Sequence, residues 1–298
     1  MTEKNTDRNE MSLYDAIARR YSVRKYADRP VEKEKIDQVL NFTPATLSDC
    51  QIKFIPVDGG IMRRYLETMG GKIFNAPMYF VLAAREGPNF LLESGYQGEQ
   101  AILAATALGL GTCWIGAFFA EKKIRALLSL DASWRMIAVS PLGYAGTGAM
   151  DRAVGGLIRR AAGSHKRRPI SEIFFAEKYG IPLESFSGKY SGWEKVCQVV
   201  RVAPSWANLQ PWRFIVRGDS VYAALVPPLG VKRGFKPAQI KSGMDYSLVD
   251  LGIALAHFNI ACQAEKKRGS WALFGDDQPK MKADLQIPDE NRLIAVWK

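Results

Sequence analysis

Paired cysteines, clustered histidines and long apolar runs are all scarce in this sequence. Its 298 residues include four cysteines and two histidines, His165 and His257, and no two cysteines have the CxxC spacing. These absences argue against a disulfide scaffold and against a zinc site. No apolar run approaches the length needed to cross a bilayer, and no apolar core of a signal peptide follows the polar first ten residues. We expect a disordered tail at residues 1–10 and a cytoplasmic location.

Charge is plentiful, and most of it is positive. The formal net charge is +11, with 24% charged and 47% apolar residues, as in an ordinary globular protein. Such a balance could favour nucleic acid or an anionic membrane surface, but the basic residues are mostly scattered. A phosphate-bearing small molecule explains their local clusters equally well. No recognition helix or aromatic stacking platform stands out, so we expect neither nucleic acid nor a membrane as partner.

One pattern occurs twice along the chain. Residues 34–55 (EKIDQVLNFTPATLSDCQIKFI) align without a gap on residues 194–215 (EKVCQVVRVAPSWANLQPWRFI), at an offset of 160. Further along, at an offset of 157, Gly95 and Trp114 meet Gly252 and Trp271. Two copies in one polypeptide suggest a fused pseudo-dimer with any site at the seam. We place copy one at residues 11–170 and the degenerate copy two at residues 171–298.

Hydrophobic periodicity predicts the main elements of both copies. Ser12 followed by Asp15 resembles a capping box at the start of the first helix. We expect helices at residues 13–20, 32–42, 93–108, 120–128, 193–202 and 245–265. We expect strands at residues 53–57, 76–84, 136–140, 213–216, 271–274 and 293–297.

Four segments carry the chemistry. They are residues 18–26 (ARRYSVRKY), 109–116 (GLGTCWIG), 141–144 (PLGY) with its basic follower 165–169 (HKRRP), and 203–214 (APSWANLQPWRF). Together they resemble the FMN-dependent nitroreductase family, whose pattern is a helix ending in RRSxR, then PSxxNxQPW, GLGxxWIG, PLGY and a closing basic pair. Here the PSxxNxQPW segment comes from the second copy and falls after the others. More narrowly, the chain resembles the subgroup with two such units fused in one polypeptide.

The resemblance implies an α+β, nitroreductase-like fold of two repeated lobes, with central mixed or antiparallel sheets flanked by helices. In that family a homodimer makes two FMN sites, each from the phosphate clamp of one subunit and the PSxxN loop of the other. Copy one keeps the arginine clamp, but Ser48 stands where copy two has Asn208. Copy two keeps the loop, but Gly180 stands where copy one has Arg20. We therefore expect one complete site, one dead site and a monomeric protein.

The same resemblance assigns roles around the flavin. Planar guanidinium groups suit the FMN phosphate, and Arg20 with Ser22 forms the expected clamp, closed by residues 166–168. Arg24 is expected near the pyrimidine edge, where a cation stabilises reduced flavin, and backbone amides of residues 114–116 are expected to face flavin N5. The predicted cofactor-binding residues are Arg20, Tyr21, Ser22, Arg24, Thr112, Cys113, Trp114, Ile115, Gly116, Lys166, Arg167, Arg168, Pro204, Ser205, Trp206, Asn208 and Gln210. No residue is predicted to be catalytic or to bind a metal.

Several of these features also have plain structural explanations. An arginine-rich helix end is usually a solvated surface. Cys113 is expected to be a small buried side chain, Trp212 a core aromatic residue, and His257 a hydrogen-bonded core histidine. His165 is expected to contact phosphate only weakly.

The favoured function is an FMN-dependent NAD(P)H oxidoreductase that reduces nitroaromatic or quinone-like acceptors by ping-pong hydride transfer. The alternative is a non-catalytic protein of the same fold that binds FMN or another phosphorylated ligand. A basic nucleic-acid-binding protein is a third, less favoured class, which would show salt-sensitive retention of DNA or RNA.

Overall fold

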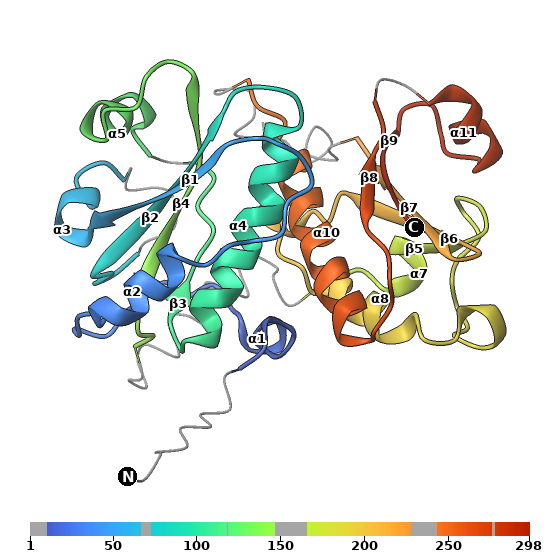
Figure 1. The fold of residues 1–298 in the computed structure, drawn as a ribbon, viewed down its shortest axis with the longest axis horizontal. Coiled ribbons are helices and arrows are strands. Elements are labelled where there is room, and N and C mark those ends of the chain that lie inside the picture. The colour runs from blue at the N-terminus through green and yellow to red at the C-terminus, as the bar shows by residue number, and fades with distance from the viewer. Residues whose placement is uncertain (1–10, 67–72, 118, 147–165, 228–242, 276–277) are drawn as a thin grey trace, which may run out of the picture.

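The computed structural model describes residues 11–66, 73–117, 119–146, 166–227, 243–275 and 278–298. Two lobes, each built around one sheet, meet along two long helices, α4 (Phe90–Ala107) and α10 (Tyr246–Ala264) (Figure 1). One hydrophobic cluster extends across both lobes, from Leu82 and Leu92 in the first to Phe214 in the second. The lobes therefore share a core, which makes their relative position part of the fold.

The first lobe has a four-stranded antiparallel sheet in the order β1-β2-β4-β3. Its strands are β1 (Ile52–Asp58), β2 (Met78–Arg85), β3 (Gly111–Thr112) and β4 (Trp134–Gly143). Besides α4, its helices are α1 (Leu13–Arg19), α2 (Lys33–Leu40), α3 (Gly59–Met62) and α5 (Glu121–Leu127).

The second lobe has a five-stranded sheet in the order β5-β6-β7-β9-β8. Its strands are β5 (Phe174–Ala176), β6 (Trp212–Arg217), β7 (Ser220–Leu225), β8 (Trp271–Leu273) and β9 (Arg292–Trp297). Besides α10, its helices are α7 (Ile170–Ile173), η1 (Gly188–Tyr190), α8 (Glu194–Arg201), η2 (Trp206–Asn208) and α11 (Pro279–Asp284).

The two sheets have the same topology. The pairs β1/β2, β2/β4 and β3/β4 correspond in order and direction to β6/β7, β7/β9 and β8/β9, all antiparallel. The matching pairs β2/β4 and β7/β9 each contain one register shift. The second sheet differs by its extra strand β5, which pairs with β6 in parallel. The predicted α+β architecture, with helices flanking central mixed or antiparallel sheets, is thus confirmed.

The contact between α4 and α10 is reciprocal. A Cβ atom at Gly95 would lie 2.0 Å from the carbonyl oxygen of Val249, and one at Gly252 would lie 2.0 Å from that of Leu92. Both pairs are related by the same offset of 157 residues. Only glycine lets two helix backbones approach this closely, which explains why both positions carry it. A surface patch that contacts its own equivalent is the geometry of a twofold interface.

Helix α10 corrects one expectation from the sequence. Its 19 residues are long and apolar enough to cross a membrane, whereas we expected no such run. However, 78% of its apolar window is buried inside the protein, where it packs on α4, α8 and α1. A helix that is apolar on all sides is expected at the centre of a large core.

Most predicted elements are present. Ser12 caps α1, since its hydroxyl accepts a hydrogen bond from the Asp15 amide at 3.1 Å. The predicted helices and strands of both copies occur within a few residues of their expected bounds. The sequence did not predict α3, β3, β5, β7, α7, η1, η2 and α11. The predicted tail at residues 1–10 lies outside the described residues, and so does His165, the first residue of the basic segment 165–169.

Candidate functional site

The end of α1 places Arg20 at the boundary between the lobes. Arg20 is the C-cap residue, and its backbone N–H donates to Ala16 O at 2.8 Å. Its side chain is only 8% exposed, and its Nε atom lies 3.6 Å from Oε1 of Glu99 on α4. The Nη1 atom is buried without a hydrogen-bond partner among the described residues. A buried guanidinium with an unused donor is suited to receive an anion.

The loop before β6 is held in an unusual backbone conformation. Ala207, Asn208 and Gln210 have positive φ angles of 46°, 55° and 47°, which cost energy for residues other than glycine. Local hydrogen bonds hold this conformation: Gln210 N donates to Ser205 Oγ at 3.0 Å, and Trp206 N donates to Asp250 Oδ1 at 2.9 Å. Such conformations are frequent where a loop serves a site.

The basic segment at residues 166–168 contacts this loop. Arg167 Nη1 donates to Asn208 Oδ1 at 2.5 Å and to Ala203 O at 3.0 Å. Asn208 Nδ2 in turn donates to Lys166 O at 2.8 Å. The predicted closing arginines and the predicted PSxxN loop are therefore in direct contact.

Positive charges from both lobes meet here. Burial lowers the pKa of Arg167 to about 10, and the charges of Arg20 and Arg201 act in the same direction, while Glu99 opposes them. The mutual effect indicates that Arg20 of the first lobe and Arg201 of α8 lie near Arg167. Arg167 still carries its charge at neutral pH, so the region is electropositive and suited to an anion.

The turn after β3 contacts both long helices. Trp114 Nε1 donates to Glu99 Oε2 at 2.7 Å, and a Cβ atom at Gly116 would lie 3.4 Å from the ring of Tyr246 on α10. The Ile115 amide instead donates to Val139 O at 3.0 Å. The prediction that this particular amide faces a flavin is therefore wrong, because the sheet already uses it. The amides of Trp114 and Gly116 keep that prediction.

Ser22, Arg24 and Cys113 lie together beside this turn. Ser22 forms a parallel bridge to Thr112, and the Val23 amide donates to Thr112 O at 2.8 Å. Burial raises the pKa of the Cys113 thiol, against the smaller effects of Arg24, the Ser22 hydroxyl and Arg20. The thiol is thus kept in its protonated form. This confirms Cys113 as a small buried side chain.

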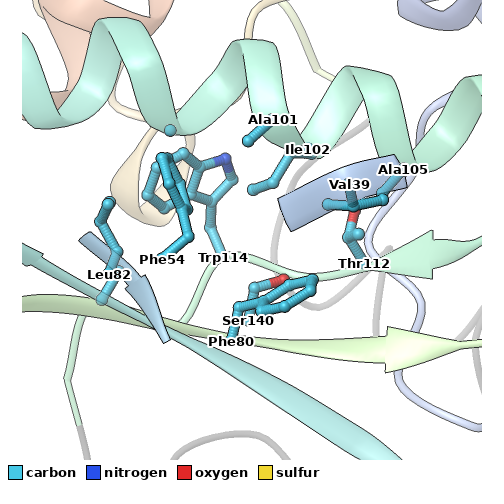
Figure 2. A pocket seen from close by; sticks show the side chains of 12 residues that line it. Val39, Phe54, Phe80, Leu82, Ala101, Ile102, Ala105, Thr112, Trp114 and Ser140 are labelled. Atoms are coloured by element: carbon cyan, nitrogen blue, oxygen red, sulfur yellow. The ribbon is translucent and has the colours of Figure 1, made fainter. Parts of the chain in front are cut away.

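Other predicted site residues have structural surroundings. The Thr112 hydroxyl is buried without a partner among the described residues and lines an apolar cavity under α4 (Figure 2). That cavity, of about 30 Å³, is far too small for a flavin. Gln210 is 1% exposed; its side chain accepts from Arg168 N at 2.9 Å and donates to Arg201 O at 3.1 Å. Gln210 therefore braces the loop from inside, and the cofactor contacts that we predicted for Thr112 and Gln210 stay predictions.

The remaining predicted residues are nearer the surface. Tyr21 is 45% exposed. The Arg168 guanidinium donates to Glu172 Oε2 at 2.7 Å on the surface of the second lobe, which turns it toward a carboxylate. Pro204 and Trp206 are half-buried in the loop, and Lys166 is exposed.

Four residues near the site were missed by the sequence analysis, namely Glu99, Arg201, Tyr246 and Asp250. Burial raises the pKa of Asp250 to about 8. A charged residue within a predicted apolar helix was the available signal for Glu99 and Asp250.

His257 is 1% exposed with both ring nitrogens hydrogen-bonded, and Trp212 is fully buried, so both predictions are confirmed. Within the described residues no cluster of potential metal ligands occurs.

Comparison with known proteins supports this description. A curated protein from Methanothermobacter thermautotrophicus, named "Putative NADH dehydrogenase/NAD(P)H nitroreductase", is 29% identical over 150 residues, which are 46% of this chain and 78% of that protein. A protein of the same name from Archaeoglobus fulgidus is 27% identical over 143 residues, which are 43% of this chain and 82% of its own.

One solved structure extends over both lobes. The crystal structure of a "putative nitroreductase" from Thermotoga maritima covers 100% of this chain and 98% of its own, with a TM-score of 0.58 and 20% identity, which shows a common fold. The family model described as "Putative TM nitroreductase" matches residues 12–262. The chain therefore belongs to this nitroreductase family.

Proposed function

We propose that the chain is an FMN-dependent NAD(P)H oxidoreductase with a single cofactor site between the lobes. The observation that supports this most is that Arg167 donates to Asn208 of copy two, while the charge of Arg20 of copy one helps to lower the pKa of Arg167. If Arg20 and Asn208 lay on surfaces far apart from each other, the proposal would be contradicted. Neither residue has an equivalent in the other copy: at the offset of 160, Arg20 aligns with Gly180, and Asn208 aligns with Ser48.

The residues present fit a phosphate. An FMN phosphate carries nearly two negative charges and accepts hydrogen bonds from guanidinium groups. Arg20 offers the unpaired Nη1 donor, and Arg167 and Arg201 add positive charge nearby. Ser22, which follows Arg20 by two residues, completes the proposed clamp.

The protein's own part in the reaction is binding and electrostatics. A bound FMN would supply the redox chemistry, hydride transfer from NAD(P)H to a nitroaromatic or quinone-like acceptor in two half-reactions. Arg24 would favour negative charge on the reduced ring. Residues 203–208 would cover the ring from the second lobe, and Cys113 takes no redox part because its thiol stays protonated.

We also propose that the chain arose by internal duplication and acts as a monomer. Matching strand orders, matching register shifts and the reciprocal Gly95 and Gly252 contacts support this origin. An interface already present within one chain removes the need for a partner subunit. The proposed boundary near residue 170 agrees with β5, which starts at Phe174 and pairs with the second sheet.

Two measurements test the function. Purified protein is expected to bind FMN and to show flavin absorption after loading. Anaerobic addition of NADH or NADPH is then expected to bleach that absorption, and addition of a quinone to restore it. Protein that binds FMN but is not bleached by either nucleotide would be a binding protein, and protein that binds no FMN would contradict the proposal altogether.

A further inference from the structure

Glu99 occupies the centre of the contacts between the lobes. Its carboxylate is fully buried, yet it reaches three different parts of the chain. Oε2 accepts from Trp114 Nε1 at 2.7 Å, while Oε1 lies 3.0 Å from Nε2 of His257 on α10 and 3.6 Å from Nε of Arg20. Figure 2 shows the Trp114 indole between the sheet and α4, with its nitrogen on the helix side.

These contacts leave one side of Arg20 available. At 3.6 Å the contact from Nε to Glu99 is an ion pair rather than a short hydrogen bond. It engages the Nε edge of the guanidinium, while Nη1 has no partner among the described residues. The carboxylate therefore orients Arg20 without using up the donor that would serve an anion.

His257 fixes Glu99 from the second lobe. Its Nδ1 lies 3.1 Å from the carbonyl oxygen of Val199, and its Nε2 faces the Glu99 carboxylate. These two contacts hold the imidazole ring between the α8 backbone and Glu99. Arg20, 3.6 Å away, offsets part of the cost of burying the Glu99 carboxylate.

The second copy shows what happens without this carboxylate. At the offset of 157, Glu99 corresponds to Ala256 and Trp114 to Trp271. Trp271 Nε1 is buried without a hydrogen-bond partner in the described part of the chain. A packed tryptophan at this position therefore does not require an acceptor. The acid is present in the copy that has Arg20, and is absent from the copy that has Gly180 instead.

We propose that Glu99 is a positioning residue. It fixes the position of Arg20 relative to the turn at Trp114, and its contact with His257 connects both to the second lobe. This inference rests on the proposed FMN site. It implies that Glu99 acts mainly on recognition of the phosphate, because Arg20 is the clamp residue that it holds.

The test compares FMN with riboflavin, which lacks the phosphate. In the wild type we expect FMN to bind at least about tenfold more tightly than riboflavin, because a phosphate pairs with guanidinium groups. Glu99→Gln keeps the shape but removes the charge. We expect it to weaken FMN binding about 10- to 100-fold and to reduce the preference for FMN, measured by quenching of flavin fluorescence. Adding Arg20→Ala to Glu99→Gln should reduce the preference little further, since the two residues act as one unit.

Glu93→Gln is the matched control. Glu93 is also fully buried on α4, but its carboxylate accepts from Leu47 N at 3.0 Å and Ser48 Oγ at 2.9 Å, in the loop of the dead site. The Glu93→Gln variant should keep the wild-type preference for FMN over riboflavin. If Glu99→Gln does not fold, His257→Gln provides the second variant, with a smaller loss in the same direction.

The inference would be overturned by either variant showing the wild-type preference, or by an equal loss in Glu93→Gln. If the wild type and Glu93→Gln bind FMN and are bleached by NADH or NADPH, the proposed function stands whichever result Glu99→Gln gives. Wild-type protein that binds neither flavin would overturn both proposals.

Discussion

Single residues at the site combine burial with charge. Arg20, Glu99, Arg167 and Asp250 are all ionisable and largely buried. Burying a charge is costly unless it is paired. Their gathering at one boundary between lobes is therefore better explained by a ligand site than by folding stability alone.

Asp250 gives a prediction about pH. Burial raises its pKa to about 8, against about 4 for an exposed aspartate. Between these values the folded protein holds a proton that the unfolded chain has released, so the free energy of unfolding falls as pH rises and levels off above about 8. Asp250→Asn keeps an acceptor for the Trp206 amide but has no proton to lose. From pH 5 to pH 9 the wild type should therefore lose more stability than the variant, by on the order of a few kcal/mol.

Urea unfolding of both proteins at several pH values measures this difference. Each protein gives a slope of the free energy of unfolding against pH. The difference between the two slopes removes the contribution of all other titrating groups. Parallel pH profiles for the wild type and Asp250→Asn would show that Asp250 is already ionised in the folded protein.

At the scale of elements, the crossing of α4 and α10 fixes the distance between the lobes. Gly95→Ala and Gly252→Ala each place a methyl group where a backbone oxygen lies 2.0 Å away. The helices must then separate, so we expect each variant to lower the free energy of unfolding by about 3 kcal/mol. Because the two contacts are equivalent, the two losses should be similar.

Gly87→Ala is the control for these variants. Nothing lies within 4 Å of the added Cβ atom there, and an exposed substitution usually changes stability by less than about 0.5 kcal/mol. Thermal or urea unfolding of the three variants gives the comparison. A loss at only one of Gly95 and Gly252, or at neither, would contradict a reciprocal interface.

Sequence periodicity predicted the long elements better than the short ones. The helices α4 and α10 and the central strand β2 were recognised because each is a long apolar segment. Strand β7 was missed, although the Gly218–Asp219 pair before it is a hairpin signal between two apolar runs. Strand β5 has only three residues and is defined by pairing with β6, which no local pattern reveals.

The candidate site was predicted only in part for a related reason. Motif spacing identified Arg20 and Asn208; in the structure Arg167 donates to Asn208, and the charge of Arg20 acts on the pKa of Arg167. Glu99 and Asp250 were missed because their importance comes from partners far away in sequence, such as Arg20, His257 and Trp206. Gln210 belongs to the motif, but its side chain serves the backbone of neighbouring segments.

At the scale of the whole molecule, the two lobes share a topology but differ in what they contribute. The first carries Arg20, Glu99 and Trp114, and the second carries the Asn208 loop and His257. We expect an asymmetric pair of this kind to form one composite site where a symmetric dimer would form two. The central claim is therefore one of stoichiometry as well as of location.

The decisive measurement is a calorimetric titration of the protein with FMN. Light scattering on the same sample gives the mass of the protein in solution. We predict a monomer that binds one FMN per chain, and an affinity about tenfold or more lower in both Arg20→Ala of the first lobe and Asn208→Ala of the second. Arg29→Ala, an exposed arginine of the first lobe, is the matched control and should bind normally. Two FMN molecules per chain, or full affinity in either site variant, would contradict a single site built from both lobes.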